Sequence, residues 1–165
     1  YSANLAAALG LPFSFADFFG TTSEHGPMIA NMYRQRFRPS EYLKEPKFHV
    51  ALQVICAETT EKADFIASSR NISRLNSLRG IREPLISPEE ASLKKLSEFD
   101  LRYIEGLSKY YIQGSPDIVK DQILEASKVY GTKDVSIATN CYYFEDRLRS
   151  FELISKAFNL SGNAF

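Results

Sequence analysis

The chain has 165 residues and carries 20 Lys and Arg against 20 Asp and Glu, so its formal net charge is zero. This balance argues against a nucleic-acid binder or a polybasic membrane protein, because both need an excess of positive charge. Apolar residues make up 44% of the chain, enough to bury a core. No apolar run reaches the ~20 residues of a transmembrane helix, and no signal-peptide pattern opens the chain.

The cysteines and histidines are few and isolated. Cys56 and Cys141 lie far apart, and neither forms a CxxC or Cys/His pattern. His25 and His49 have no metal-ligand spacing, so we interpret both as structural. We therefore expect no disulfide framework and no metal site, and we place the protein in a reducing cytoplasm.

The first third of the chain alternates between helix and strand signals. Ser2 is a favourable N-cap, and Gly10 is a favourable residue just after a helix end. The stretch at 48–57 is almost continuously apolar, as expected of a strand covered on both faces. The predicted elements are a helix at 2–9, a strand at 11–19, a helix at 27–37 and a strand at 48–57.

The rest of the chain contains three marked helix starts. Thr59 or Thr60 caps the first, Ser87 caps the second ahead of Pro88, and Ser115 caps the third ahead of Pro116. The predicted elements are a helix ending near 78, a loop at 81–87, one or two helices up to 111, a helix ending at 131, a strand at 134–139 and a helix at 144–158.

Strands that alternate with helices predict an α/β protein with a parallel sheet. We count about three parallel strands, too few for a closed (β/α)₈ TIM barrel, which takes roughly 250 residues. The helix pattern also begins at once behind Tyr1. We therefore expect a fragment: a partial barrel, with residues 1–160 forming one half of a single domain and residues 161–165 a frayed tail.

Five stretches of the sequence match the motifs of one known family. The segment at 1–16 (YSANLAAALGLPFSFA) resembles "SAxLAAxLGLPFAFA", and the segment at 33–40 (YRQRFRPS) resembles "YRxxFxPS". The others are VALQVICAETTEKA at 50–63, the GSP helix start at 114–116 and RLRSFEL at 147–153. They occur in family order and span nearly the whole chain. Together they resemble the bacterial luciferase-like flavin monooxygenases.

The resemblance implies the C-terminal half of a (β/α)₈ barrel, whose partner in the fold is the missing N-terminal half. It implies reduced FMN as cofactor, supplied by an NAD(P)H-dependent flavin reductase, with O₂ and a small organic molecule as substrates. Some relatives use the deazaflavin F420 instead, and homodimers are common in the family. The flavin carries the difficult chemistry, which explains why the sequence shows no catalytic triad.

The resemblance implies that hydroxyl residues at the first helix bind the FMN phosphate. That role falls on Ser2 and, less directly, on Tyr1. Helix N-termini attract phosphate through free N–H groups and the helix dipole. The alternative is that Ser2 is a plain N-cap.

The carboxyl end of the first predicted strand is the second candidate site. The resemblance implies that Ala16, Asp17 and Phe18 approach the flavin ring or the substrate. Many relatives have Ser-His where this chain has Asp17 and Phe18, so an acid or base role is open. A carboxylate among aromatic residues needs a partner, water or a loop to cap. For Phe15 we favour core packing.

Residues behind the later strands are weaker candidates. Glu58 follows one strand, and Asn140, Cys141 and Tyr142 follow another, where they could line a pocket. Cys141 has no nearby histidine to activate it as a nucleophile. We assign Thr59 to a helix cap. The motif at 114–116 could be taken as an anion-binding site, but helix capping explains it fully. We predict that Arg147 and Arg149 are ion-pair partners of Glu145, Asp146 or Glu152.

Catalytic residues stay unassigned, because the assisting histidine of luciferase belongs to the other half of the barrel. Two alternatives remain beside the monooxygenase: a flavin-binding or structural relative without turnover, and an F420-dependent oxidoreductase.

Overall fold

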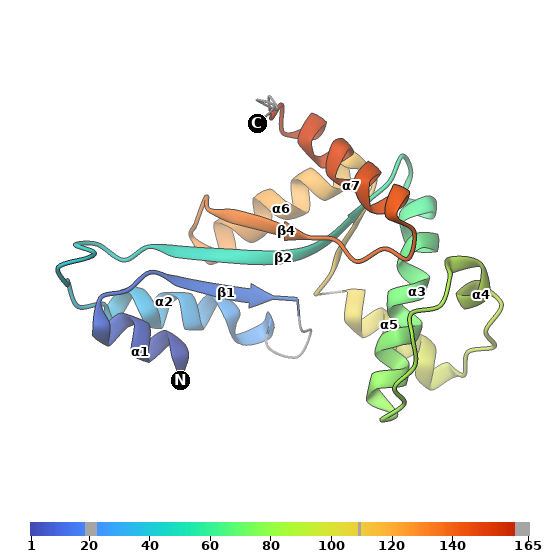
Figure 1. The fold of residues 1–165 in the computed structure, drawn as a ribbon, viewed down its shortest axis with the longest axis horizontal. Helices are drawn as coiled ribbons and strands as arrows, with labels where there is room; N and C mark the ends of the chain where they lie inside the picture. Colours follow the sequence, from blue (N-terminus) through green and yellow to red (C-terminus); the bar gives the residue numbers. More distant parts are fainter. Residues whose placement is uncertain (19–22, 109, 161–165) are drawn as a thin grey trace. The chain divides into compact units, whose positions relative to one another are not determined.

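The structure, a computed structural model, describes residues 1–18, 23–108 and 110–160. Helices and strands alternate along much of the chain (Figure 1). In order the elements are α1 (Ser2–Leu9), β1 (Phe13–Asp17), the 3₁₀ turn η1 (Ser23–His25), α2 (Gly26–Arg36), β2 (Phe48–Cys56), α3 (Thr60–Leu78), α4 (Pro88–Ser92), α5 (Glu98–Ser108), β3 (Ile112–Gly114), α6 (Pro116–Tyr130), β4 (Val135–Ala138) and α7 (Phe144–Ala157).

The strands form one parallel four-stranded sheet centred on β2. β1 runs along the first part of β2, with Phe13 opposite Phe48 and Asp17 opposite Leu52. β3 runs along the last part of β2. β4 also pairs with β2, where the Val50 N–H donates to the Asp134 carbonyl at 3.1 Å.

This arrangement confirms the predicted α/β half barrel, and the sheet has one strand more than the about three expected. The strand that the sequence did not predict is β3, which is only three residues long. It leads directly into the helix start at Pro116, so no run of alternating or apolar residues marks it in the sequence. The tail predicted at 161–165 lies outside the described residues, as does Phe19 at the end of the predicted first strand.

The chain folds into two compact units. Unit 1 contains Tyr1–Leu52 and Leu124–Ala138, and unit 2 contains Gln53–Ile123 and the chain from Thr139 onward.

In unit 1, α1 and α2 pack against each other and against β1 (Figure 1). Gly10 ends α1 with a φ of 65° and donates its N–H to the Ala6 and Ala7 carbonyls, which confirms its predicted place. A Cβ on Gly10 would lie 2.5 Å from the Arg38 carbonyl oxygen. Glycine is therefore required both by the left-handed backbone and by the close approach of the two segments.

Aromatic rings fill the core of unit 1. Tyr33 is fully buried and touches Phe13, Phe37 and Phe48, with ring centroids 5.6 to 6.2 Å apart. The ring of Tyr130 stacks on that of Phe48 at 6.1 Å and an angle of 12°. Contacts of this kind add to the stabilisation from apolar burial alone. They fix α2 and the end of α6 to the sheet.

In unit 2, the long helix α3 carries two apolar clusters. Its first half packs Ala63, Ile66 and Ala67 on the end of β2. Its second half packs against α4 and α5 through the cluster of Ile72, Leu75, Ala91 and their neighbours. The caps are those expected from the sequence, because the Thr59 and Ser87 side chains accept hydrogen bonds from the Lys62 and Glu90 N–H groups.

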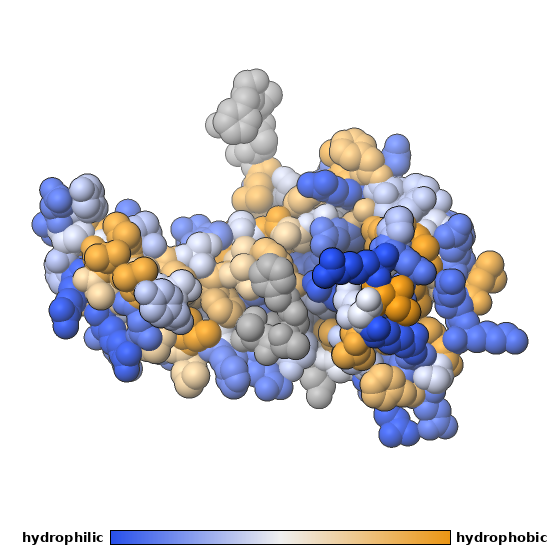
Figure 2. Space-filling view, turned by 60° about the horizontal axis from the view of Figure 1, so that its bottom comes forward, coloured by the Kyte–Doolittle hydropathy of each residue, from blue (hydrophilic) through white to orange (hydrophobic). Residues whose placement is uncertain are grey.

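Many apolar side chains stay at the surface. Leu5, Met28, Leu93 and Phe99 are among those that are largely exposed. Figure 2 shows hydrophobic residues at several separate places on the displayed face, with hydrophilic residues between them. No helix in the described part of the chain combines the length and the apolar character needed to cross a membrane.

Candidate functional site

A buried carboxylate ends β1. Asp17 is 8% exposed, and the Tyr130 hydroxyl donates a hydrogen bond of 2.7 Å to its Oδ2. Burial, and then the bond to Asp17, raise the pKa of Tyr130, so the hydroxyl stays protonated and keeps donating. The sequence left open what partner Asp17 has, and the structure shows a tyrosine at the end of α6 in that role.

Gly26, at the start of α2, leaves room for this pair. A Cβ at Gly26 would lie 1.9 Å from the Tyr130 hydroxyl and 2.9 Å from Phe15 Cε1. The ring of Phe15 also contacts that of Tyr130 at 6.0 Å, which agrees with the packing role expected for Phe15. Nothing in the sequence pointed to Gly26 or Tyr130, because 113 residues separate the two members of the hydrogen bond.

The other residues predicted beside Asp17 lie at the same end of the strand. Ala16 pairs with Ala51 in the sheet, and Phe18 follows the last residue of β1. Both are half-buried. Their assignment to a substrate pocket stays a prediction.

The first helix has the predicted bounds, Ser2–Leu9. Its N-cap is Tyr1 and Ser2 is its first helical residue, so the prediction of Ser2 as N-cap was wrong. No side chain caps this end, Ser2 is exposed, and Tyr1 is 98% exposed. Arg36 donates a hydrogen bond of 2.8 Å to Asn4 in the first turn. The helix end therefore has uncapped N–H groups and a cation beside its first turn. No local signal predicts this cation, because Arg36 and Asn4 are 32 residues apart.

Ion pairs surround the carboxyl end of β2 in unit 2. Arg149 bonds to Glu58 at 2.7 Å and to Glu152 at 3.0 Å. The hydrogen bond from Arg149 lowers the pKa of Glu58 below its usual range. Glu152 was a predicted partner and Glu58 was not. Among the described residues Arg147 forms no ion pair, so its predicted pairing was wrong.

Neither cysteine is activated. Burial raises the pKa of Cys56 and of Cys141 to about 11, so both are thiols at neutral pH. This agrees with the rejection of Cys141 as a nucleophile. The described residues contain no group of three or more His, Cys, Asp or Glu that could hold a metal. His49 bonds to Ser14 at 2.6 Å, which fits a structural role.

Five buried side-chain atoms of the described chain have no hydrogen-bond partner, and all belong to unit 2. Native proteins leave few such groups, because an unpaired buried donor or acceptor costs free energy. They are Gln53 Oε1, Ser69 Oγ, Arg70 Nη1, Tyr111 Oη and Thr139 Oγ1.

Known proteins resemble the chain over nearly its whole length. It is 34% identical to the uncharacterised protein YwcH of Bacillus subtilis over 95% of the chain and 47% of that protein. It is 26% identical to the luciferase-like monooxygenase of Escherichia coli K12 over 93% of the chain and 45% of that protein. The chain thus spans about half the length of the curated relatives it matches. No protein-family profile matches it.

Two solved structures share the fold. Apo-MsnO8 superposes with a TM-score of 0.86 and 28% identity, over 97% of this chain and 48% of that one. The second is the oxygenating constituent of 3,6-diketocamphane monooxygenase from Pseudomonas putida, a type II Baeyer-Villiger monooxygenase in complex with FMN. It superposes with a TM-score of 0.54 and 17% identity, over 94% of this chain and 44% of that one. The fold and these relatives define an α/β half barrel of the monooxygenase type. The chain is thus similar to luciferase-like monooxygenases over nearly its whole length.

Proposed function

We propose that the chain is the C-terminal half of an FMN-dependent monooxygenase that oxygenates a small organic molecule with reduced flavin and O₂. The observation that carries this proposal is the similarity to the Escherichia coli luciferase-like monooxygenase along 93% of the chain. The neighbour that contains FMN supports flavin as the cofactor.

The start of α1 fits a phosphate group. Its uncapped N–H groups and the positive end of the helix dipole attract an anion. The exposed Ser2 hydroxyl adds a further donor, and Arg36 at Asn4 adds positive charge to the same turn. In this proposal Ser2 and the first-turn N–H groups hold the FMN phosphate, with Tyr1 beside them.

The residues at the end of β1 take the substrate side in this proposal. Ala16 and Phe18 contribute apolar surface there. The hydrogen bond from Tyr130 holds the Asp17 carboxylate in place, so we assign Asp17 a positioning role rather than proton transfer. Reduced FMN supplies the electrons that activate O₂, and the protein binds the reactants, orients them and excludes water.

The proposal includes partners. The N-terminal half of the same barrel completes the fold, an NAD(P)H-dependent reductase delivers reduced FMN, and two copies form a homodimer.

Anaerobic titration of the full-length gene product with reduced FMN, followed by admission of O₂, tests the activity. Oxygen uptake coupled to oxygenation of an added aldehyde supports the monooxygenase. Uptake that yields only hydrogen peroxide across a substrate panel supports a relative without turnover. Binding of F420 with no binding of FMN supports the F420 alternative.

A matched pair of variants tests the phosphate assignment. We expect Ser2→Ala to weaken FMN binding about tenfold and to leave riboflavin binding unchanged, because a hydrogen bond to a charged group is lost. Ser77→Ala removes a serine hydroxyl from the exposed face of α3 and is the control. Equal loss of FMN and riboflavin affinity in Ser2→Ala would refute a phosphate contact.

A further inference from the structure

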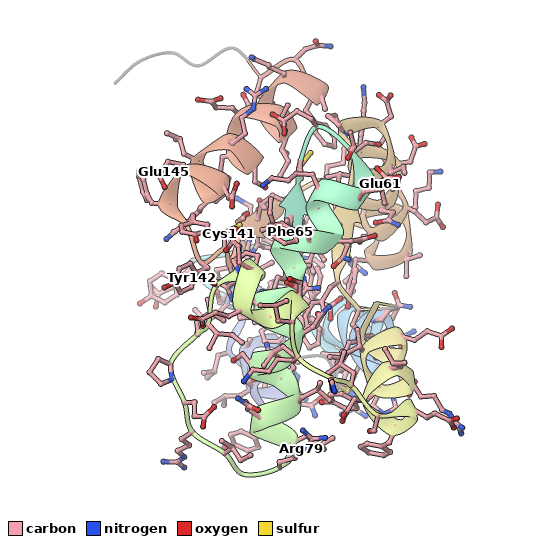
Figure 3. The ribbon with its side chains drawn as sticks, turned by 90° about the vertical axis from the view of Figure 1, so that its right-hand side faces the viewer. Glu61, Phe65, Arg79, Cys141, Tyr142 and Glu145 are labelled. Carbon is pink, nitrogen blue, oxygen red and sulfur yellow. The ribbon has the colours of Figure 1, made fainter. Side chains whose placement is uncertain are left out.

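Unit 2 contains a cavity of about 350 Å³ behind the end of β4. Helix α3 contributes Arg70 and Arg74, and the segment that leads into α7 contributes Thr139, Asn140 and Cys141. Figure 3 shows Cys141 beside α3, where it packs on the apolar cluster at the end of β2. Arg147 of α7 completes this part of the lining.

The cavity is strongly cationic. Three guanidinium groups line it, and none of its lining residues is acidic. Two acidic residues that lie outside this lining have partners of their own. Asp64 accepts a hydrogen bond of 2.5 Å from Gln113, and Asp146 lies 4.0 Å from the Lys62 ammonium.

Arg70 is the most deeply buried of the three, at 5% exposure. Its Nη2 donates to Gln113 at 2.5 Å and to Asn71 at 3.1 Å, and its guanidinium lies 4.3 Å from the centre of the Tyr111 ring. Its Nη1 has no acceptor. Burial lowers the pKa of Arg70 to about 10; Tyr111 opposes this shift and Arg74 adds to it.

A second buried donor also lacks a hydrogen-bond acceptor. Thr139 is 4% exposed, lines the same cavity, and its hydroxyl has no hydrogen-bond partner. An arginine N–H and a threonine hydroxyl are both donors that need oxygen acceptors when buried. The surrounding charge favours acceptors that are negatively charged, since paired charge offsets the cost of burying a guanidinium.

We propose that this cavity binds an oxyanion of the phosphate class. A tetrahedral oxyanion offers several acceptor oxygens, and it can accept from Arg70 Nη1 and the Thr139 hydroxyl together with Arg74 and Arg147. Arginine suits this group because its planar fork of donors matches phosphate oxygens. The volume of about 350 Å³ also leaves room for an organic part, so the phosphate can be free or esterified. The inference goes beyond the proposed function, because the FMN phosphate is assigned there to Ser2 in unit 1.

Calorimetric titration of the full-length protein with inorganic phosphate, at constant ionic strength in a phosphate-free buffer, tests the proposal. We expect saturable binding that equal ionic strengths of chloride do not abolish. Arg147→Gln and Arg74→Gln should each weaken it at least tenfold. Neither side chain is buried, so both variants should fold, which a thermal melt checks. Arg102→Gln, a change of the same charge on the exposed face of α5, should leave binding unchanged.

Competition separates the sources of the phosphate group. Displacement of bound phosphate by AMP but not by adenosine would assign the cavity to the phosphate end of a nucleotide. Displacement by neither would assign it to free phosphate. Unsaturable heats, or equal affinity in the wild type, Arg147→Gln and Arg74→Gln, would overturn the proposal. These results do not depend on turnover or on Ser2, so they are separable from failure of the monooxygenase assignment.

Discussion

The two units treat buried polar groups in opposite ways. In unit 1 the buried polar groups are partnered: the Tyr33 hydroxyl donates to the Leu11 carbonyl at 2.8 Å and accepts from the Lys47 N–H at 3.2 Å, and Asp17 is held by Tyr130. In unit 2 five buried side-chain atoms lack partners. The comparison teaches that the buried polar groups of unit 1 serve the fold, whereas two of the unpartnered groups of unit 2, on Arg70 and Thr139, line the cavity for which we propose an oxyanion.

The largest loss of stability is expected at Gly26, where unit 1 is very closely packed. Gly26→Ala would place a methyl group 1.9 Å from the Tyr130 hydroxyl, so it must displace the ring or the start of α2. We expect the free energy of unfolding to fall by about 3 kcal/mol, as for other overpacked cores. Urea denaturation measures it. Gly106→Ala is the control: nothing lies within 4 Å of its added Cβ in α5, so stability should rise by about 0.5–1 kcal/mol.

Removal of the hydroxyl tests the buried pair itself. Tyr130→Phe leaves Asp17 without this donor, and we expect a loss of about 2 kcal/mol in the free energy of unfolding. Because the pKa of Tyr130 is raised in the folded state, its contribution is present below about pH 10, the unfolded-state pKa, and is lost as pH rises above it. Denaturation at pH 8 and at pH 11 should therefore differ less in Tyr130→Phe than in the wild type. Tyr42→Phe, on an exposed ring of unit 1, should match the wild type at both pH values.

A pair of variants in unit 2 should have effects of opposite sign. Thr139→Val removes an unpartnered buried hydroxyl at nearly constant volume, so without phosphate it should raise the free energy of unfolding by about 1 kcal/mol. Ser150→Ala removes the acceptor of the buried Cys56 N–H, a bond of 2.9 Å, and should lower it by about 1 kcal/mol. Chemical denaturation in phosphate-free buffer compares them. Destabilisation by Thr139→Val would show that its hydroxyl has a partner, against the contrast between the units.

The smallest effect on stability is expected at Asp100, a buried carboxylate of unit 2 that lies at the start of α5 and has hydrogen-bond partners. Asp100 accepts from the Ser97 N–H at 3.0 Å and from its hydroxyl at 2.9 Å, and it pairs with Arg79. The Ser97 N–H, followed by the other two bonds, holds the pKa of Asp100 below its ordinary value. Its stabilisation is therefore present above about pH 4 and is lost as pH falls through the folded-state pKa. In acid titrations followed by circular dichroism, Asp100→Asn should lack this loss, and the exposed Asp121→Asn should keep it.

Local signals predicted the fold well where the physics is local. The caps at Thr59 and Ser87, the end of α1 at Gly10 and the apolar run of β2 depend on residues within a few positions of one another. The sequence did not predict β3, because its three residues form a strand only by pairing with the end of β2, more than 50 positions earlier.

The candidate sites were less predictable from the sequence. The resemblance to a known family placed attention on Ser2 and Asp17, but it could not supply their partners. Tyr130 reaches Asp17 from 113 residues away, and Arg36 reaches Asn4 from 32. Arg70 reads in the sequence as one more surface charge on an amphipathic helix, and only tertiary packing buries it.

The end of α6 has a consequence for the order in which the protein assembles on the ribosome. Arg34 donates to the carbonyls of Tyr130 and Gly131 at 2.5 and 3.0 Å, across a span of 96 and 97 residues. At roughly 5–20 residues per second, the arginine is synthesised about 5–20 s before its acceptors. Phe48 is synthesised far sooner, and in the finished structure its ring lies 5.1 Å from the same guanidinium. We therefore expect Phe48 to offer Arg34 an early partner in the nascent chain, before the last turn of α6 docks onto the same side chain.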